Sequence, residues 1–180
     1  MLRRKEWMCT PRSQPFVRRS SSTGMELGGR PKSEFIAIAE MASPFVRDVL
    51  KLKFISGSQG HLIMNFDARD SFIGHPKTKV LHGGVVAAAL DHVAGFSAWT
   101  TLDDKMTMIS TVDLRVDYLK PCPFEAELQV VGRVISIMKR TIRVDVELRT
   151  KEKSLIAVGR GSFNAYSPRI LIDSVSGEDN

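Results

Sequence analysis

One stretch of the chain is apolar at nearly every position, residues 80–102 (VLHGGVVAAALDHVAGFSAWTTL). Over 83–100 the apolar residues fall on all sides of a helical wheel, and a helix that is apolar all round is buried. Asp91 and His92 interrupt its middle, and at roughly 16 to 18 residues the run is a poor membrane span. The pattern predicts one long helix in the centre of the molecule, with an acid halfway along it.

The other segments alternate apolar and polar residues, as strands with one buried face do. Strands are expected at 51–56, 61–67, 108–119, 125–138, 141–150 and 154–166, and shorter helices at 33–41 and 45–50. Consecutive strands joined by short turns make an antiparallel sheet. Only the 83–100 helix is apolar enough to cover the inner face of that sheet. The predicted fold class is α+β, an antiparallel β-sheet wrapped around one long central helix.

Composition indicates one globular domain. The 180 residues are 43% hydrophobic and 26% charged, which is ordinary for a chain with a core of its own. Cys9 and Cys122 have neither metal-ligand spacing nor the pattern of a disulfide framework, so we expect no metal and no cofactor. No run of apolar residues is long enough to predict a membrane span.

Most of the net positive charge of the chain lies in its N-terminal segment. Seven Lys and Arg against two Glu leave +5 on residues 1–30, out of +6 for the whole chain. The remainder is near neutral, so we expect no nucleic-acid partner. Residues 1–30 are a basic disordered tail or an organellar transit peptide, unless translation begins at Met25. We expect a domain over 31–168, a frayed tail at 169–180, and a cytoplasmic location, or the mitochondrial matrix if 1–24 is a transit peptide.

Four motifs taken together carry a resemblance to a known family. They are LHGGVVAAALDHVAGFSA (81–98), STVDLRVDYLKP (110–121), Gly132-Arg133 and LIAVGRGSF (155–163). The chain from about residue 33 to 166 resembles hotdog-fold acyl-CoA thioesterases of the phenylacetic-acid-degradation type, related to the 4-hydroxybenzoyl-CoA thioesterases with a His-Gly-Gly turn. The resemblance implies the hotdog fold and hydrolysis of an acyl- or aryl-CoA thioester. It also implies a homodimer, commonly paired into a tetramer, and exposed strand edges agree with oligomerisation.

Asp91 is the first candidate catalytic residue. Its neighbours on the same helical face are small or apolar: Ala87, Ala88, Ala94 and Gly95. A buried carboxylate without a partner is costly, so such a residue is usually functional, although a solvated or paired acid remains the alternative. By resemblance, Asp91 is the carboxylate that attacks the thioester or activates a water molecule.

The His82-Gly83-Gly84 turn is the second candidate. Free N–H groups at a helix N-terminus favour developing negative charge, so the amide of Gly83 or Gly84 could polarise the thioester carbonyl as an oxyanion hole. The resemblance places that role at Gly83, with Gly84 beside the substrate. Glycine flexibility in a turn is the alternative reading, and His82 is expected to be structural.

The spacing of these candidates predicts a shared site. Nine helical residues separate His82 from Asp91, a rise of about 13.5 Å and a rotation near 180°. One thioester carbon needs both groups within about 3–3.5 Å, which a straight helix cannot supply. We therefore expect Asp91 of one subunit to face the Gly83 end of another.

Flanking positions leave alternatives open. By resemblance, His75 stands where relatives carry an Asn or Gln that orients the thioester, and it either substitutes or the role is lost. Thr111 either holds the attacking water, as the resemblance implies, or is an ordinary strand residue. Four basic side chains either bind the CoA phosphates or are simply solvated at the surface: Lys120, Arg133, Lys139 and Arg140. An apolar acyl pocket would be lined by Phe72, Phe96, Trp99 and Met108.

Two other functions compete with the thioesterase. A hotdog hydratase carries an Asp-x4-His pair, and Asp70 and His75 fit that spacing, but without the Asn-Pro and small-residue context of the motif. A non-catalytic acyl-CoA-binding module is the other alternative, which the altered loop at His75 allows and Asp91 argues against.

Overall fold

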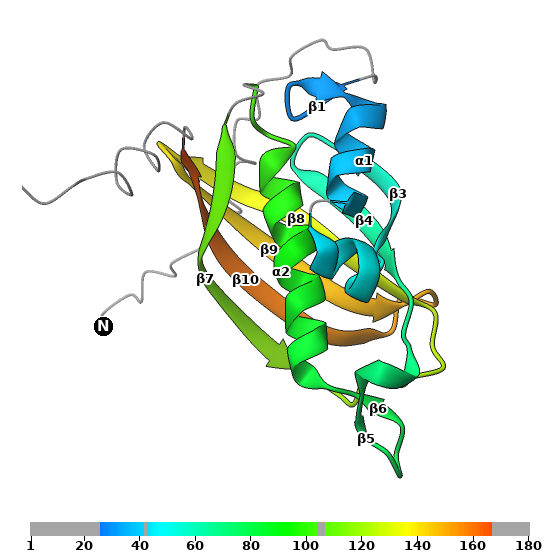
Figure 1. Ribbon diagram of the computed structural model, residues 1–180. Helices are drawn as coiled ribbons and strands as arrows, with labels where there is room; N and C mark the ends of the chain where they lie inside the picture. Colours follow the sequence, from blue (N-terminus) through cyan, green and yellow to red (C-terminus); the bar gives the residue numbers. More distant parts are fainter. Residues whose placement is uncertain (1–25, 42, 104–106, 167–180) are drawn as a thin grey trace, which may run out of the picture.

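The computed structural model describes residues 26–41, 43–103 and 107–166. Six strands form one antiparallel sheet in the order β3-β4-β8-β9-β10-β7 (Figure 1). The strands are β3 (Lys53–Ser58), β4 (His61–Phe66), β7 (Met108–Tyr118), β8 (Leu128–Met138), β9 (Thr141–Thr150) and β10 (Leu155–Tyr166). The long helix α2 (Gly83–Trp99) lies across the inner face of this curved sheet. The predicted α+β architecture, a sheet wrapped around one helix, is confirmed.

Alternation along the strands separates the two faces of the sheet. In β9 the residues Ile142, Val144, Val146 and Leu148 are buried against α2, while the residues between them point outward. The helix passes so close to β8 that a Cβ atom at Gly132 would overlap the Ser97 hydroxyl. Glycine is therefore required where α2 crosses β8.

The segment before the sheet differs from the sequence prediction in detail. The helix α1 (Lys32–Met41) forms as expected, and the π-helix η1 (Phe45–Leu50) follows it. Lys51 takes a left-handed conformation (φ 49°) that ends η1, so β3 begins two residues later than the predicted strand.

A short hairpin lies within the segment predicted as a tail. Strands β1 (Glu26–Leu27) and β2 (Arg30–Pro31) pair around Gly28 and Gly29, both with positive φ, which is the conformation of a two-residue hairpin turn. Leu27 and Arg30 are buried. The predicted boundary at residue 30 thus falls inside a folded element, whereas 1–25 and the predicted frayed tail at 169–180 lie outside the described residues.

Residues 68–79, for which no helix or strand was predicted, also contain structure. The 3₁₀ helix η2 (Asp70–Phe72) leads into a small hairpin of β5 (Ile73–His75) and β6 (Val80–Leu81) beside the start of α2. In contrast, 125–127 are not strand, and β8 begins at Leu128. None of the helices in the described part of the chain is long and apolar enough to cross a membrane.

Candidate functional site

The first half of the candidate site is the N-terminus of α2. His82 caps the helix. Its ring Nδ1 accepts a hydrogen bond from the Gly84 N–H at 3.0 Å, and its backbone N–H donates to the Phe72 carbonyl at 2.7 Å. A Cβ atom at Gly74 would collide with the His82 backbone, so β5 packs directly against the cap. His82 therefore has a structural role, and the Gly84 N–H, expected beside the substrate, is used within the chain.

The backbone N–H of Gly83 takes no part in this capping arrangement. It occupies the first helical position, where no intrahelical acceptor exists, and no described residue accepts its hydrogen. The carbonyl of Gly83 accepts from the Tyr118 hydroxyl at 2.8 Å, and the Tyr118 ring lies over the glycine. Tyr118 was not among the sequence candidates. Together Tyr118 and His82 fix the first turn and leave one N–H available.

The second half of the site is Asp91. Its side chain is half-buried, and its Oδ1 accepts a hydrogen bond from the Thr111 hydroxyl at 2.9 Å. The expectation of a buried carboxylate without a partner was therefore wrong on both counts. The small residue Gly95 matters for a different reason, because it helps to leave open space beside the acid.

A bulge in β7 brings Thr111 to that side of the sheet. Ser162 of β10 pairs with Asp113 and Phe163 pairs with Thr111, so Val112 is an extra residue without a partner in β10. Such a bulge shifts the inward and outward alternation by one residue. Thr111 and Tyr118, an odd and an even position, can thus both reach α2, while Val112 is exposed.

An apolar cavity of about 330 Å³ opens beside Asp91. Its lining comes from α1, α2, β7 and β10: Ile38, Asp91, His92, Gly95, Phe96, Trp99, Met108, Ile109, Thr111 and Phe163. Three of the four predicted pocket residues are present. Phe72 is not, because it is buried in the core and stacks on Phe66 at 5.9 Å between ring centroids.

His92 joins the cavity wall to α1. Its Nε2 lies 2.7 Å from the Ala39 carbonyl, and its ring centroid lies 4.6 Å from that of Phe96. Burial lowers the pKa of His92, which favours the neutral ring donating one hydrogen to Ala39. His92, next to the candidate acid, thus links α2 to α1 through this hydrogen bond.

The remaining sequence candidates do not gather around Asp91. His75 lies at the exposed tip of the β5–β6 hairpin, where its Nδ1 is 2.9 Å from the Thr78 hydroxyl. Lys120 follows the Tyr118 end of β7 and hydrogen-bonds Ser154. Lys139 and Arg140 form the β8–β9 turn, and Arg133 lies in a hollow on the outer face of the sheet. The structure does not bring these four cations together.

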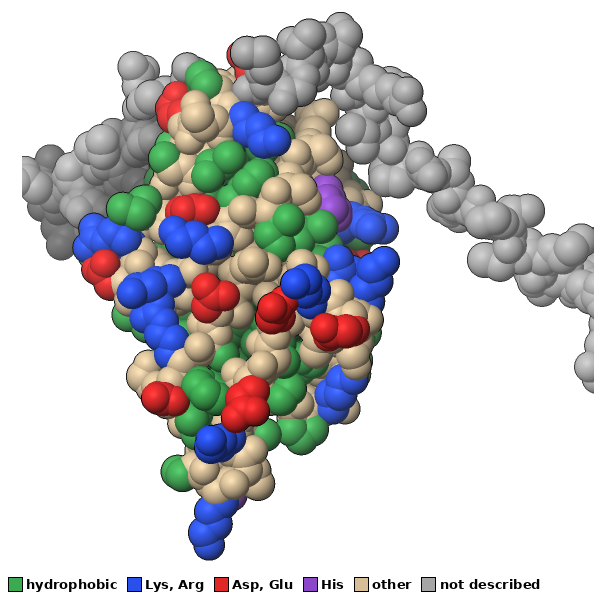
Figure 2. All heavy atoms as spheres, turned by 90° about the vertical axis from the view of Figure 1, so that its right-hand side faces the viewer, with side chains coloured by type: hydrophobic (Ala, Val, Ile, Leu, Met, Phe, Trp, Pro, Cys, Tyr) green, Lys and Arg blue, Asp and Glu red, His purple; other side chains and the backbone are tan. Residues whose placement is uncertain are grey.

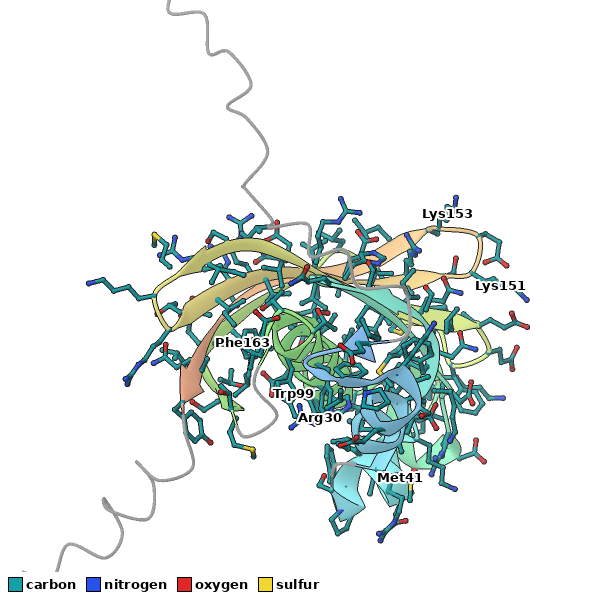
Figure 3. The ribbon with its side chains drawn as sticks, turned by 90° about the horizontal axis from the view of Figure 1, so that it is seen from above. Arg30, Met41, Trp99, Lys151, Lys153 and Phe163 are labelled. Atoms are coloured by element: carbon teal, nitrogen blue, oxygen red, sulfur yellow. The ribbon has the colours of Figure 1, made fainter. Side chains whose placement is uncertain are left out.

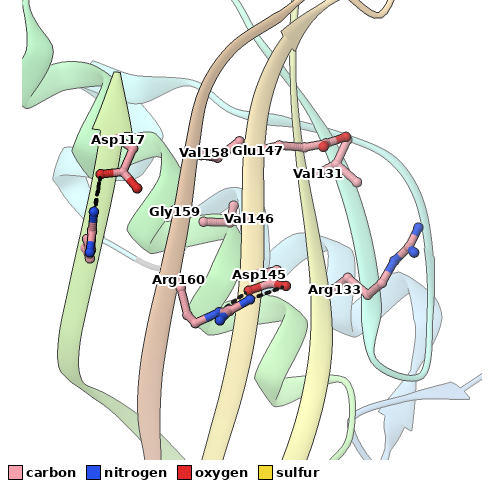
Figure 4. A pocket seen from close by; sticks show the side chains of 10 residues that line it. Asp117, Val131, Arg133, Asp145, Val146, Glu147, Val158, Gly159 and Arg160 are labelled. Carbon is pink, nitrogen blue, oxygen red and sulfur yellow. Dashed lines mark hydrogen bonds and ion pairs between the residues drawn. The ribbon is translucent and has the colours of Figure 1, made fainter. Parts of the chain in front are cut away.

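The outer hollow is larger, at about 650 Å³, and carries charges of both signs (Figure 4). Arg160 donates to both oxygens of Asp145 at 2.6 and 3.0 Å, and Arg115 pairs with Asp117 at 3.1 Å. On the face of the molecule shown in Figure 2, acidic and basic side chains are likewise interspersed. Neither surface has the single-sign field that attracts nucleic acid.

The described residues include no cluster of three or more His, Cys, Asp or Glu that could hold a metal. Cys122 is buried as a free thiol, and burial raises its pKa to about 11, so it is a poor nucleophile. Cys9 lies outside the described part.

Comparison with known proteins agrees with this architecture. The sequence model of the thioesterase superfamily matches residues 78–157. The medium/long-chain acyl-CoA thioesterase YigI of Escherichia coli is 29% identical over 110 residues, which are 54% of this chain and 70% of YigI. A thioesterase from Haemophilus influenzae superposes with a TM-score of 0.67 at 16% identity, covering 78% of this chain and 94% of that one.

The PaaI protein of the E. coli phenylacetic acid degradation operon superposes with a TM-score of 0.64 at 17% identity, over 73% of this chain and 91% of that one. The fold is the hotdog fold of thioesterases. At such identities the superpositions establish the hotdog fold alone, and the superfamily match covers α2, β7, β8, β9 and the start of β10. Both halves of the candidate site, Gly83 and Asp91, lie on the matched part of this hotdog domain.

Proposed function

We propose that this protein is an acyl-CoA thioesterase that hydrolyses an acyl- or aryl-CoA to the free acid and CoA. The observation that carries the proposal is Asp91 at the edge of an apolar cavity, with Thr111 donating to its carboxylate. An acyl chain would enter the cavity and leave its thioester carbon beside the Asp91 side chain. The superfamily match and the acyl-CoA thioesterase activity named for YigI support the same reaction.

The chemistry needs one activated oxygen and one hydrogen-bond donor. Asp91 either attacks the thioester carbon itself or takes a proton from a water molecule that attacks it. The carbonyl oxygen becomes negative and is stabilised by the Gly83 N–H. The C–S bond then breaks, and the CoA thiolate takes a proton. If Asp91 is the nucleophile, water then hydrolyses the mixed anhydride between the acyl group and Asp91; if water attacks, the acid is released directly. In both cases the acid carries one oxygen from water.

Both groups lie on one helix, so a single chain cannot use them on one carbon. Gly83 and Asp91 are eight positions apart, which is about 12 Å along the helix. A dimer formed through the exposed edge of the sheet could bring the two groups together. Within the described part of the chain, strand β7 pairs only with β10, and it exposes Val112 (58%) and Tyr118 (52%). A long edge with exposed apolar residues is a template for pairing with another chain.

Two copies joined by their β7 strands would run antiparallel about a two-fold axis. With the axis near the middle of β7, the Thr111 end of one strand faces the Tyr118 end of its partner. Thr111 touches Asp91 and Tyr118 touches Gly83, so each Asp91 would approach the Gly83 amide of the other subunit. The homodimer thereby forms two complete sites. The pairing of dimers into a tetramer stays a prediction.

The test is complementation between two inactive chains. Asp91→Ala removes the acid, and Gly83→Pro removes the amide hydrogen at the first helical position, where proline is tolerated. His82 already has the extended conformation (φ −65°, ψ 130°) that a following proline requires. Gly83→Ala, which keeps the N–H, is the matched control.

In a shared site, mixing the two chains in equal amounts restores about a quarter of the wild-type activity, because half of the dimers are mixed and each has one intact site. The absence of any recovery, with mixed dimers verified by mass, would disprove the shared site. If the wild-type protein releases no thiol from any acyl- or aryl-CoA, the thioesterase itself is disproved and a non-catalytic binding module is favoured.

A further inference from the structure

The cavity beside Asp91 follows one stripe of α2. Asp91, Gly95 and Trp99 are spaced by four residues, so they lie on the same face of the helix, and all three line the cavity. The acid stands at one end and the indole at the other. Gly95 between them leaves the space open, since a Cβ atom there would already stand 3.4 Å from the Phe163 ring.

Aromatic rings pack around Trp99 at the far end of the cavity. Trp99 lies between Phe163 of β10 and Arg30 of β2 (Figure 3). The Arg30 guanidinium stacks on the indole at 4.2 Å, and Phe96 contacts it edge-on at 5.2 Å. The helix rises about 12 Å from Asp91 to Trp99, which is the extended length of roughly eight to ten carbons.

Volume gives the same limit. At about 30 Å³ per heavy atom, the 330 Å³ cavity holds about eleven atoms. A phenylacetyl or benzoyl group has fewer atoms and would leave part of the apolar surface of the cavity without contact. The cavity therefore suits a flexible chain of medium length better than a single ring.

At the far end, the one polar group among the described lining residues, the Trp99 indole N–H, is already bonded. Among the described lining residues, the polar side chains are Asp91, Thr111, His92 and the Trp99 indole. The indole N–H donates to the Thr107 carbonyl at 3.0 Å, and the His92 Nε2 is bound to Ala39. A hydroxylated aryl group would bury its hydroxyl without a side-chain partner there, at a cost that disfavours it.

We infer that the preferred substrate is a saturated, medium-chain acyl-CoA of about eight to ten carbons, with Gly95 and Trp99 setting the chain length. This inference rests on the proposed thioesterase function, because it names the substrate of the same site. It follows from the size and lining of the cavity in this chain.

The experiment measures kcat/KM for saturated acyl-CoAs from two to sixteen carbons, together with phenylacetyl-, benzoyl- and 4-hydroxybenzoyl-CoA. Each buried methylene should raise kcat/KM about fourfold, so that octanoyl-CoA exceeds butanoyl-CoA by about 100-fold or more, with no further rise beyond about ten carbons. If the best substrate is a short-chain, long-chain or aromatic acyl-CoA, the chain-length inference is overturned, but the proposed thioesterase activity is not. Calorimetric binding of the same esters to the full chain ranks chain length even if none is hydrolysed.

Substitutions in the stripe should move the optimum in opposite directions. Gly95→Leu fills the cavity one helical turn from Asp91, and it should move the optimum to about four carbons. Trp99→Ala opens the far end and should extend it beyond twelve carbons. Ser56→Leu adds the same side chain on the exposed edge strand β3 and should leave the profile as in the wild type. An unchanged profile in folded Gly95→Leu protein would overturn the inference even if Trp99→Ala fails to fold.

Discussion

The sheet has a hollow on each of its two faces, and the two differ in what surrounds their acids. On the outer face, about 650 Å³ of open space is lined by arginines and acids that bind one another, as Arg160 does with Asp145. On the inner face, about 330 Å³ lies among mostly apolar side chains, and Asp91 accepts a hydrogen bond from the Thr111 hydroxyl. The lining described for the inner cavity contains no Lys or Arg.

This contrast shows why the smaller hollow is the better candidate site. An acid that is already paired with a guanidinium in water has neither unmet charge nor a reason to be reactive. An acid at the edge of an apolar cavity gains strength as a base or nucleophile once substrate excludes water from it. The chemistry of the lining, rather than the size of the hollow, favours the inner cavity as the candidate site.

Replacing one acid on each face gives the largest expected difference. Asp91→Asn should lower kcat by about 10³-fold or more, because the amide can neither attack nor accept a proton. Asp145→Asn makes the same change in the outer hollow and should leave kcat within about twofold. Thiol release from octanoyl-CoA measures both. Equal losses in the two variants would show that the comparison of the hollows is wrong.

A second pair of variants tests the hydrogen bond to the acid. Thr111→Val keeps the shape of the side chain but removes its donor, and a hydrogen bond to a charged group is worth enough to lower kcat about 10- to 100-fold. Thr141 donates to the Asn164 side chain at 3.0 Å on an exposed part of the sheet, so Thr141→Val is the matched control and should stay near the wild-type rate. A normal kcat in Thr111→Val would make Thr111 an ordinary strand residue.

How far the sequence predicted this site depends on the kind of interaction. The all-round apolar pattern placed α2 correctly, and alternation placed β9 and β10, because burial on one face leaves a period that can be read directly. The resemblance drew attention to Gly83 and Asp91. These predictions concern residues close together in the chain or on one element.

The contacts between distant segments were not predictable in this way. The bulge at Val112 interrupts the alternation of apolar and polar residues along β7, so the apolar Val112 is exposed. Tyr118 reaches Gly83 across 35 residues and His92 reaches Ala39 across 53. The Gly28-Gly29 turn could have been recognised as a hairpin, but the charge of the surrounding segment favoured a disordered tail.

The Tyr118 contact has a smaller predicted effect than the acid. Tyr118→Phe keeps the ring over Gly83 but removes the donor to its carbonyl, so the first turn of α2 should become less ordered. One neutral hydrogen bond corresponds to a loss of about two- to tenfold, which should appear in kcat rather than in KM. Tyr166→Phe at the end of β10 serves as the control. A change confined to KM would mean that Tyr118 contacts the substrate instead of positioning Gly83.

The inner face should also be sensitive to pH through His92. Because burial lowers the folded-state pKa below the unfolded value of about 6.5, the unfolded chain binds the proton more readily. The free energy of unfolding should therefore decrease as the pH falls from about 6.5 towards the lowered pKa of the folded state. His92→Gln should flatten this part of the curve, measured by urea unfolding between pH 5 and 8. His61, whose pKa burial also lowers, remains in both proteins, so only the difference between the curves counts.

The outer face should respond least of all. The Arg160 and Asp145 side chains keep 66% and 43% of their exposure, and ion pairs so open to water are screened and contribute little. The double variant Arg160→Ala, Asp145→Ala should shift the unfolding midpoint by no more than about 2 °C and leave the chain-length profile unchanged. Because the two charges are removed together, no unpaired ion remains to complicate the result. A large loss of stability that depends on protein concentration would show that the outer hollow is covered by another subunit, and the difference between the two faces would then be one between two interfaces.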